Sequence, residues 1–386
     1  MPIEEPKPVA APSGFALFAL GFRPFYLLAA AFAAIAMVVW VASVHGLRWH
    51  GYLAPVLWHQ HEMIAGFALA VITGFLLTAG RVWTGRGTPE GWPLALLALH
   101  WLAARVLMYT GPASAAAVVD GAFPFVVAAL MARAIVGAGN RRNYFVIALL
   151  AAFGAVNLWF HYAPGEPPMR AALWLVMTLI VVMAGRVVPS FTANALPKAG
   201  VVLQPRLDRA ALVATLAAFA SDVLALGAVF VAPFALAAAV LHALRQWGWR
   251  PFATRGRPIL WILHLSHAWI PLGFVLLALE SLGIASDAAP LHAFGAGAMG
   301  GLIIAMITRT ALGHTGRPLA AGGGEIAAYV LVHVAAALRV WAALAPGSAY
   351  WWMITLSGAA WSIAFLVYAA VYLPRLARPR LDGKPG

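Results

Sequence analysis

Apolar segments of about twenty residues follow one another along almost the whole chain, and they constrain its fold more than any other feature. A helix needs roughly 20 predominantly apolar residues to cross the hydrocarbon core of a bilayer. Hydrophobic residues make up 63% of the 386 residues and charged residues only 10%, whereas soluble domains carry about 25% charged residues. The pattern predicts an all-α, polytopic membrane protein and excludes a soluble globular domain.

Arginine, proline and glycine residues separate twelve of these segments, so we expect about twelve transmembrane helices. The stretch 209–247 holds two of them, because Gly227 and Pro233 favour a short turn. The first segment is full length and follows an acidic, proline-rich amino terminus, so no signal peptide is expected. The twelve segments are residues 24–44, 58–79, 92–111, 114–136, 144–161, 170–188, 209–227, 230–247, 258–282, 290–311, 325–345 and 351–373.

Basic residues give the expected orientation. Of the 25 lysine and arginine residues, 21 fall in or beside the two ends of the chain and alternate loops. The positive-inside rule then places both termini in the cytoplasm, with tails at 1–21 and 376–386. The net charge of +13 is therefore mainly a topology signal. No nucleic-acid partner is expected, because the basic residues are not clustered on one folded surface.

Similar sequences recur along the chain and predict three four-helix repeats, at 22–140, 141–255 and 256–375, within a single transmembrane domain. Each repeat opens on a related sequence: RPFYLLAAAF from Arg23, RNYFVIALLAAF from Arg142 and RPILWILHLSH from Arg257. The third segment of each repeat carries one charged residue at a spacing of 117: Arg105, Asp222 and Arg339. Parallel repeats often place a site at their interface. The alternative is that apolar helices resemble one another by chance.

The three charged residues at this spacing are candidates for function, because ionisable groups inside the hydrocarbon are costly. Asp222 can neutralise either Arg105 or Arg339. The other arginine could then bind an anionic group, such as a haem propionate. The alternative is a structural ion pair that holds the repeats together.

Four histidines form an inner layer, each about six to nine residues from a predicted cytoplasmic helix end. His264 and His267 are three residues apart, so both could approach one centre. Axial haem ligands need a neutral imidazole in an apolar slot with cations nearby, and Arg339 lies about 9 Å along the helix from its neighbouring histidine. Ordinary hydrogen-bonded packing is the alternative for each of the four: His100, His264, His267 and His333.

An outer histidine layer includes the motif WHQHEM, which contains His59, His61 and Glu62, and His292 in LHAFGAG. If residues 59–62 are helical, the two WHQHEM histidines point about 200° apart and cannot share one metal. If the helix begins at Glu62, an extended backbone places both imidazoles on one side. These residues could supply copper or haem ligands, with Glu62 as proton carrier or as orienter of a ligand. The alternative is a polar and aromatic interface belt.

The absence of cysteine limits any metal to histidine, methionine, carboxylate or backbone ligands. His314 in GHTGRP lies at a predicted cytoplasmic helix end, where it could cap that helix or bind an anion together with Arg317. No phosphate-binding loop, zinc-protease motif, serine-triad signature or nucleotide fingerprint is present. Hydrolases and ATP-driven machines therefore lose most of their support.

Four segments resemble signature sequences of the NnrS family of bacterial inner-membrane proteins: FRPFYLLAA at 22–30, WHQHEMIAGFALAVITGFLLTAGRVWTG at 58–85, RVVPSFT at 186–192 and MITRTALGHTGRPL at 306–319. The resemblance implies twelve spans, a haem expected to be of the b type, copper, and protection from nitric oxide in denitrification and nitrosative stress. It also implies that the motif residues matter, namely His59, His61, Glu62, His292, Arg309, His314, Thr315, Gly316 and Arg317.

The leading hypothesis is thus a haem and copper membrane protein that sequesters nitric oxide or another small gas, or reduces it as a reductase-like oxidoreductase. We expect His264 and His333 to hold haem, with His100, His267, Arg105 and Arg339 around it. Copper or a second haem would bind His59, His61 and His292. The two layers differ by roughly 10–15 Å in depth, which argues against one compact binuclear centre. The expected partners are the lipid bilayer and an electron donor of unknown identity.

Two other hypotheses compete with this one. The histidine, arginine and aspartate residues inside the membrane could form a proton or anion pathway in a transporter without a redox cofactor. The chain could also be a structural scaffold in a denitrification complex.

Overall fold

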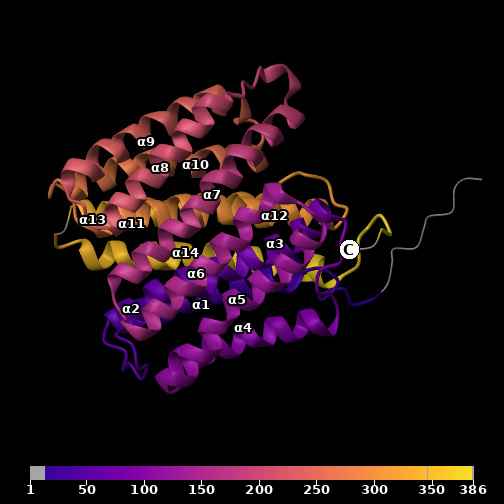
Figure 1. Cartoon of the computed structure of the whole chain (residues 1–386), viewed down its shortest axis with the longest axis horizontal. Coiled ribbons are helices and arrows are strands. Elements are labelled where there is room, and N and C mark those ends of the chain that lie inside the picture. Colours follow the sequence, from indigo (N-terminus) through magenta and orange to yellow (C-terminus); the bar gives the residue numbers. More distant parts are fainter. Residues whose placement is uncertain (1–13, 346, 385–386) are drawn as a thin grey trace, which may run out of the picture.

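The computed structural model describes residues 14–345 and 347–384, and all regular structure in this part of the chain is helical (Figure 1). The α-helices are α1 (Phe22–Val44), α2 (Pro55–His61), α3 (Leu69–Thr84), α4 (Trp92–Thr110), α5 (Ala113–Gly137), α6 (Tyr144–Tyr162), α7 (Glu166–Ala195), α8 (Pro205–Val223), α9 (Ala228–Gly248), α10 (Pro258–Ser281), α11 (Ala288–His292), α12 (Gly301–His314), α13 (Gly323–Leu344) and α14 (Tyr350–Ala377). Two π-helical segments are η1 (Glu62–Ala68) and η5 (Ala293–Gly300), and short 3₁₀ turns are η2 (Arg141–Asn143), η3 (Pro197–Ala199) and η4 (Pro251–Thr254).

These elements form twelve long helices, because α2, η1 and α3 are continuous, as are α11, η5 and α12. Eleven of the twelve are long and apolar enough to cross a membrane. The exception is α8, whose 19 residues include Arg206, Asp208, Arg209 and Asp222. The all-α, multi-pass class predicted from the sequence is confirmed, with eleven candidate spans in place of twelve.

Local sequence explains where several helices begin. Proline occupies the first turn of α2, α4, α7, α8 and α10, where its missing N–H leaves no hydrogen bond unmade. The predicted turn between α8 and α9 is present, and it ends at Gly227 with a φ of 80°. Pro233, in contrast, lies inside α9.

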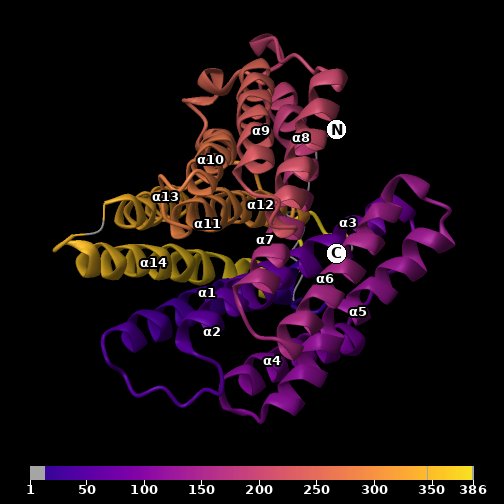
Figure 2. The same cartoon turned by 60° about the vertical axis from the view of Figure 1, so that its left-hand side comes forward.

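The helices group into three lobes around a centre (Figure 2). One lobe combines α4, α5 and α6, a second α8, α9 and α10, and a third α13, α14 and α1. Each lobe thus joins the last two helices of one predicted repeat to the first helix of the next, and α1 closes the ring. A threefold repeat would produce this arrangement, while the repeat itself stays a prediction.

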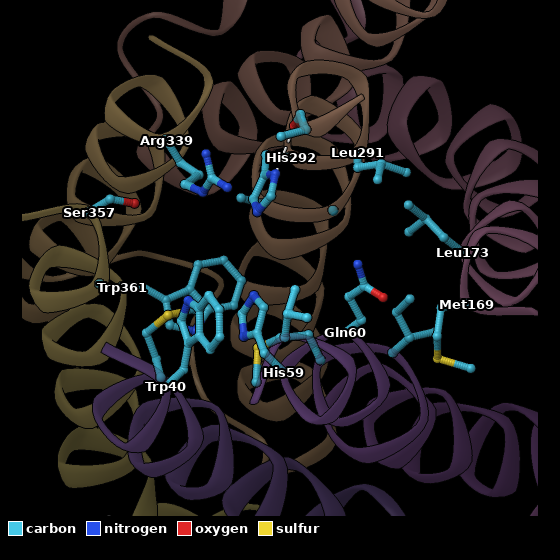
Figure 3. A pocket seen from close by; sticks show the side chains of 18 of the residues that line it. Trp40, His59, Gln60, Met169, Leu173, Leu291, His292, Arg339, Ser357 and Trp361 are labelled. Atoms are coloured by element: carbon cyan, nitrogen blue, oxygen red, sulfur yellow. Dashed lines mark hydrogen bonds between the residues drawn. The ribbon is translucent and has the colours of Figure 1, made fainter. Parts of the chain in front are cut away.

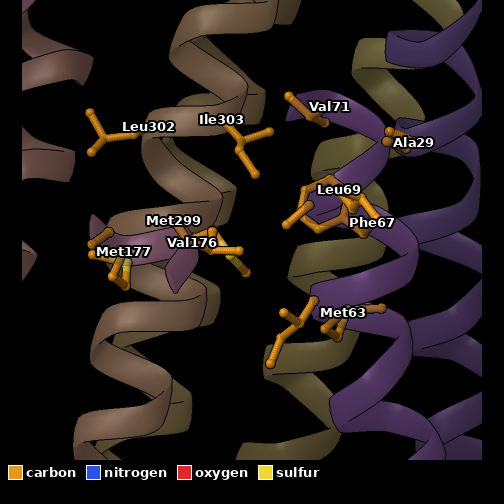
Figure 4. Packing of buried hydrophobic residues seen from close by; sticks show 14 of the residues in the cluster. Ala29, Met63, Phe67, Leu69, Val71, Val176, Met177, Met299, Leu302 and Ile303 are labelled. Carbon is orange, nitrogen blue, oxygen red and sulfur yellow. The ribbon is translucent and has the colours of Figure 1, made fainter. Parts of the chain in front are cut away.

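The second helix of each predicted repeat fills the centre. In α2–η1–α3 and in α11–η5–α12, 83% and 72% of the most apolar stretch is buried, and α7 packs against both π-helical segments. Figure 4 shows the contact between these helices, where Leu69 and Val71 face Ile303. The two π-helical segments occupy comparable places in the first and third predicted repeats. Segments of this kind occur frequently at functional sites.

Both described ends of the chain meet at one end of the bundle, which we call the terminal face. There the N–H of Ala16 donates to the carbonyl of Ala377 at 2.8 Å, and Leu381 donates to Thr315 at 3.1 Å. The opposite end, where α7 and α11 begin, is called the distal face. The predicted cytoplasmic tails lie partly outside the described residues, at 1–13 and 385–386, and the orientation of the two faces stays a prediction.

Candidate functional site

A cavity of about 230 Å³ lies among the central helices, towards the distal face (Figure 3). Side chains from α1, α2, η1, α7, α11, η5, α13 and α14 line it, so it joins the first, second and third predicted repeats. Most of its wall is apolar, and the few polar groups converge from different helices. Figure 3 labels Trp40, His59, Gln60, Met169, Leu173, Leu291, His292, Arg339, Ser357 and Trp361.

Two imidazoles face each other across this cavity. His292 donates from Nδ1 to the carbonyl of Ala288 at 2.7 Å, so its Nε2 keeps a lone pair for a ligand. His59 stacks on the Trp40 indole, with ring centroids 4.7 Å apart, and its Nδ1 finds no hydrogen-bond partner among the described residues. Each histidine therefore offers one nitrogen to a metal ion.

Several other buried polar atoms around the cavity lack protein partners in the part of the chain that the structure describes. They are Gln60 Oε1, Arg339 Nη1 and Trp361 Nε1. Buried polar groups are nearly always hydrogen-bonded to protein or to ordered water. All three residues line the cavity, so a small polar occupant there could serve as their partner.

Four methionine thioethers also line the cavity, from α1, η1, α7 and η5. Thioether and imidazole together suit Cu(I), whereas carboxylate-rich sites suit harder ions. Methionine also fills irregular gaps in apolar cores, so its presence alone does not define a site. The four residues are Met37, Met63, Met169 and Met299.

Arg170 lies at the distal rim of the cavity. Its contacts show that the predicted pairing of Asp222 is wrong. We expected Asp222 to neutralise Arg105 or Arg339. Instead, Arg170 donates to both of its carboxylate oxygens, at 2.6 and 2.9 Å, and also to Glu280 at 2.6 Å. The predicted segment 170–188 begins at Arg170, whereas α7 begins four residues before it.

Arg105 is also paired, on the other side of α2. Its guanidinium donates to Glu62 at 2.6 Å and to Asp120, so it is not available to a propionate. Glu62 accordingly does not line the cavity. The prediction from the sequence did not include Asp120, which lies within the predicted segment 114–136. The spacing of 117 selected only charged residues that lie in the third helix of each repeat.

The expected inner histidine layer does not form one centre in this structure. His264 Nε2 lies 2.9 Å from Thr192 Oγ on α7. His333 accepts from Trp269 at its Nδ1, at 3.0 Å, and its Nε2 lies 3.3 Å from Ser266 Oγ. His264 and Ser266 both lie on α10, two residues and about 200° apart. His264 therefore points away from the side of α10 on which Ser266 contacts His333.

The other two inner histidines have separate partners again. His267 Nδ1 lies 2.8 Å from Gln246 Oε1, and its Nε2 lies 3.3 Å from Arg245. His100 donates from Nε2 to the carbonyl of Val119 at 2.7 Å. In this structure, therefore, all four histidines make ordinary hydrogen-bonded packing contacts, which is the alternative to haem binding given in the sequence analysis.

The GHTGRP region lies at the terminal face. The Arg309 guanidinium lies over the Phe191 ring at 3.9 Å, and the carbonyl of His314 accepts from Arg380 at 3.0 Å. Arg317 Nη1 lies 3.5 Å from the carbonyl of Thr315, and none of these side chains lines the cavity. In the tail beyond α14, hydrogen bonds from Arg380 lower the pKa of Asp382 to about 2.

Comparison with known proteins identifies the family. The model of the NnrS protein family matches residues 16–380, which is nearly the whole chain. The chain belongs to the NnrS family. A search of curated proteins finds no match. Membership in the NnrS family indicates a membrane protein related to nitric oxide, and it confirms the resemblance found in the four sequence segments.

Proposed function

We propose that this NnrS protein binds nitric oxide at a copper ion held between His59 and His292, and that it protects cells from nitrosative stress in the bacterial inner membrane during denitrification. The observation that carries the proposal is the pair of imidazoles that face one buried cavity, each with a nitrogen left for a ligand. The adjacent arginine, Arg339, supplies a partly buried guanidinium whose Nη1 has no hydrogen-bond partner among the described residues.

The residues around the cavity fit copper. Two imidazole nitrogens and nearby thioethers form a soft ligand set that favours Cu(I). The hydrogen bond from His292 Nδ1 to Ala288 fixes the ring orientation, as backbone carbonyls commonly do for histidine ligands of metals. Copper bound here would supply an open coordination position and one-electron chemistry.

The size of the cavity suits a small gas. A water molecule takes about 30 Å³ of liquid volume, so a cavity of about 230 Å³ holds an ion together with a diatomic molecule. Arg339 and Trp361 both line the cavity, and each has an N–H without a partner among the described residues.

A haem does not fit this cavity unless the helices separate. The cavity volume is below the roughly 300–1,000 Å³ of pockets for drug-sized ligands, and a porphyrin is at least as large as those ligands. Both ring nitrogens of His333 are engaged, although His264 Nδ1 has no partner in the described part of the chain. The haem b expected from the resemblance is therefore tested separately, by oxidised and reduced absorption spectra of the purified protein.

Metal analysis tests the copper assignment. The protein is expressed with copper, purified in detergent and analysed beside His59→Ala and His292→Ala. We expect the wild type to retain more copper per chain than either variant, since each variant removes one of the two nitrogens. His100→Ala is the matched control, because His100 is a membrane-embedded histidine outside the cavity. Equal copper in all four proteins would overturn the assignment.

A second candidate function, a proton- or anion-coupled transporter, is favoured by the charged networks around Arg105 and Arg170. Such networks also occur in proteins that move ions across membranes. The same metal analysis separates the two functions. A wild-type protein without copper or haem would favour the transporter.

A further inference from the structure

A second histidine cluster lies on the side of α2 that faces away from the cavity. α2 is helical through His61, so His59 and His61 point in opposite directions, as the helical alternative for WHQHEM requires. His61 meets Asp120 of α5 and His161 of α6. The Nε2 atoms of both histidines and one carboxylate oxygen lie within 4.8 Å of one another.

The hydrogen bonds of His61 require a cation. Its Nδ1 lies 2.9 Å from Glu62 Oε1, and its Nε2 lies 3.0 Å from Asn157 Oδ1 and 3.1 Å from Asp120 Oδ2. All three neighbours are oxygen acceptors, because the Asn157 amide nitrogen is turned towards Asp120 at 2.7 Å. A neutral imidazole has only one N–H. One ring nitrogen would therefore direct a lone pair at oxygen unless a second proton or a metal ion lies there.

The local charge also favours a cation. Glu62 and Asp120 are both buried, and they share a single guanidinium, that of Arg105. With neutral histidines, this cluster carries one negative charge that no other cation among residues 14–345 and 347–384 is seen to pair with. Buried charges of this kind are paired or coordinate metals.

Arg105 also arranges the ligand atoms. It binds Asp120 through Oδ1, which leaves Oδ2 to face both histidines. His161 Nε2 and His61 Nε2 lie 2.9 and 3.1 Å from that oxygen. Ligand atoms about 2.0–2.2 Å from a tetrahedral metal ion are separated by about 3.3 Å, so small side-chain shifts would accommodate an ion.

We propose that His61, Asp120 and His161 bind a divalent first-row transition ion, and that Glu62 orients His61 through its Nδ1. Two imidazoles with one carboxylate are a common ligand set for such ions. A histidine ligand that donates its other N–H to a carboxylate is equally common. The site does not depend on the function proposed for the cavity.

The position of the site explains how an ion would reach it. His161 lies in the last turn of α6 at the distal face, next to Tyr162, which is 91% exposed. An ion would therefore approach the ligands from the distal face. The WHQHEM motif would then serve two metal sites, with His59 on one side of α2 and His61 on the other.

The test uses Co²⁺ as a visible-absorbing probe with the full-length protein in detergent, after removal of metals by a chelator. The parent protein is the double variant His59→Ala, His292→Ala, in which the cavity lacks its two nitrogens. We expect this parent to bind a single Co²⁺ per chain. Adding His161→Ala should weaken binding by more than about 100-fold, and adding Glu62→Gln should weaken it by about 10–100-fold.

The control is His45→Ala on the same background, because His45 is an exposed distal histidine that contacts Thr355 instead. It should leave Co²⁺ binding unchanged. Thermal unfolding of each protein identifies any variant that fails to fold. If His161→Ala does not fold, the proposal is tested by comparing the Co²⁺ affinity of the milder variant Glu62→Gln with that of the parent protein. A parent protein that binds no Co²⁺, or equal affinity with and without His161, would overturn the proposal and assign a proton to His61.

Discussion

At the scale of single residues, Arg170 connects three helices, α7, α8 and α10, although no sequence motif marks it. One guanidinium on α7 binds Asp222 of α8 and Glu280 of α10, and Trp174 donates to the same aspartate at 2.7 Å. These side chains are about nine-tenths buried or slightly less. The network therefore fixes the second lobe against the centre, beside the rim of the cavity.

Replacing Asp222 with asparagine should destabilise the protein by about 2 kcal/mol, because the amide has no negative charge and keeps only one of the two oxygens that accept from Arg170 and Trp174. The apparent melting temperature in detergent, followed by tryptophan fluorescence, measures the effect. Glu166→Gln is the control, since its oxygen lies 3.4 Å from Arg170 and its side chain is 43% exposed. Equal melting temperatures for Asp222→Asn and the wild type would contradict the role of this network.

Histidine spacing predicted one part of the site and missed another. The helical alternative for WHQHEM correctly separates His59 from His61, because it follows from helix geometry alone. The partners of His61 could not be predicted, since they come from α5 and α6, and no spacing rule reports which faces of distant helices meet. Depth along a helix likewise placed His264 and His333 in one layer, although their contacts point to different neighbours.

At the scale of helices, packing at the centre depends on small residues. Gly74 of α3 lies against the first turn of α1, where an added Cβ would come within 2.9 Å of Phe25 Cβ and 3.2 Å of the Gly21 carbonyl oxygen. Close approach of this kind is typical of helix contacts inside membranes. The neighbours are backbone atoms or atoms next to the backbone, so they cannot move aside easily.

We expect Gly74→Ala to cost about 1–3 kcal/mol through overpacking. Gly313→Ala is the matched control, because its added Cβ would meet only a leucine methyl at 3.8 Å. Thermal unfolding in detergent compares the two variants. If Gly74→Ala unfolds at the same temperature as Gly313→Ala, the contact between α1 and α3 is looser than the structure indicates.

The long helices themselves were predictable, and their internal geometry was not. Hydropathy found eleven spans because a membrane helix needs a long apolar run. Hydropathy also predicted a span over α8, but the charged residues at both ends of this helix leave its apolar stretch too short. The π-helical segments η1 and η5 could not be predicted from hydropathy. A π-helical turn changes the rotation of the chain without changing its composition, so only tertiary packing reveals it.

At the scale of the whole molecule, charge is divided unequally between the two faces. Most arginines lie at or near the terminal face, whereas the distal rim of the cavity carries Glu166, Asp287 and the Arg170 network. If the terminal face is cytoplasmic, as the positive-inside rule predicts, the cavity and the His61 cluster both lie towards the outer side of the membrane. Metal ions would then reach them from outside the cytoplasm.

The absence of cysteine makes this orientation directly testable, because any introduced thiol is unique. Tyr162→Cys places one at the distal face and Leu381→Cys places one at the terminal face, and both positions are exposed. A membrane-impermeant thiol reagent should label Cys at 162 in intact cells, and Cys at 381 only after permeabilisation. The wild-type chain should remain unlabelled throughout. The reverse pattern would place the terminal face outside, and it would direct both proposed metal sites towards the cytoplasm.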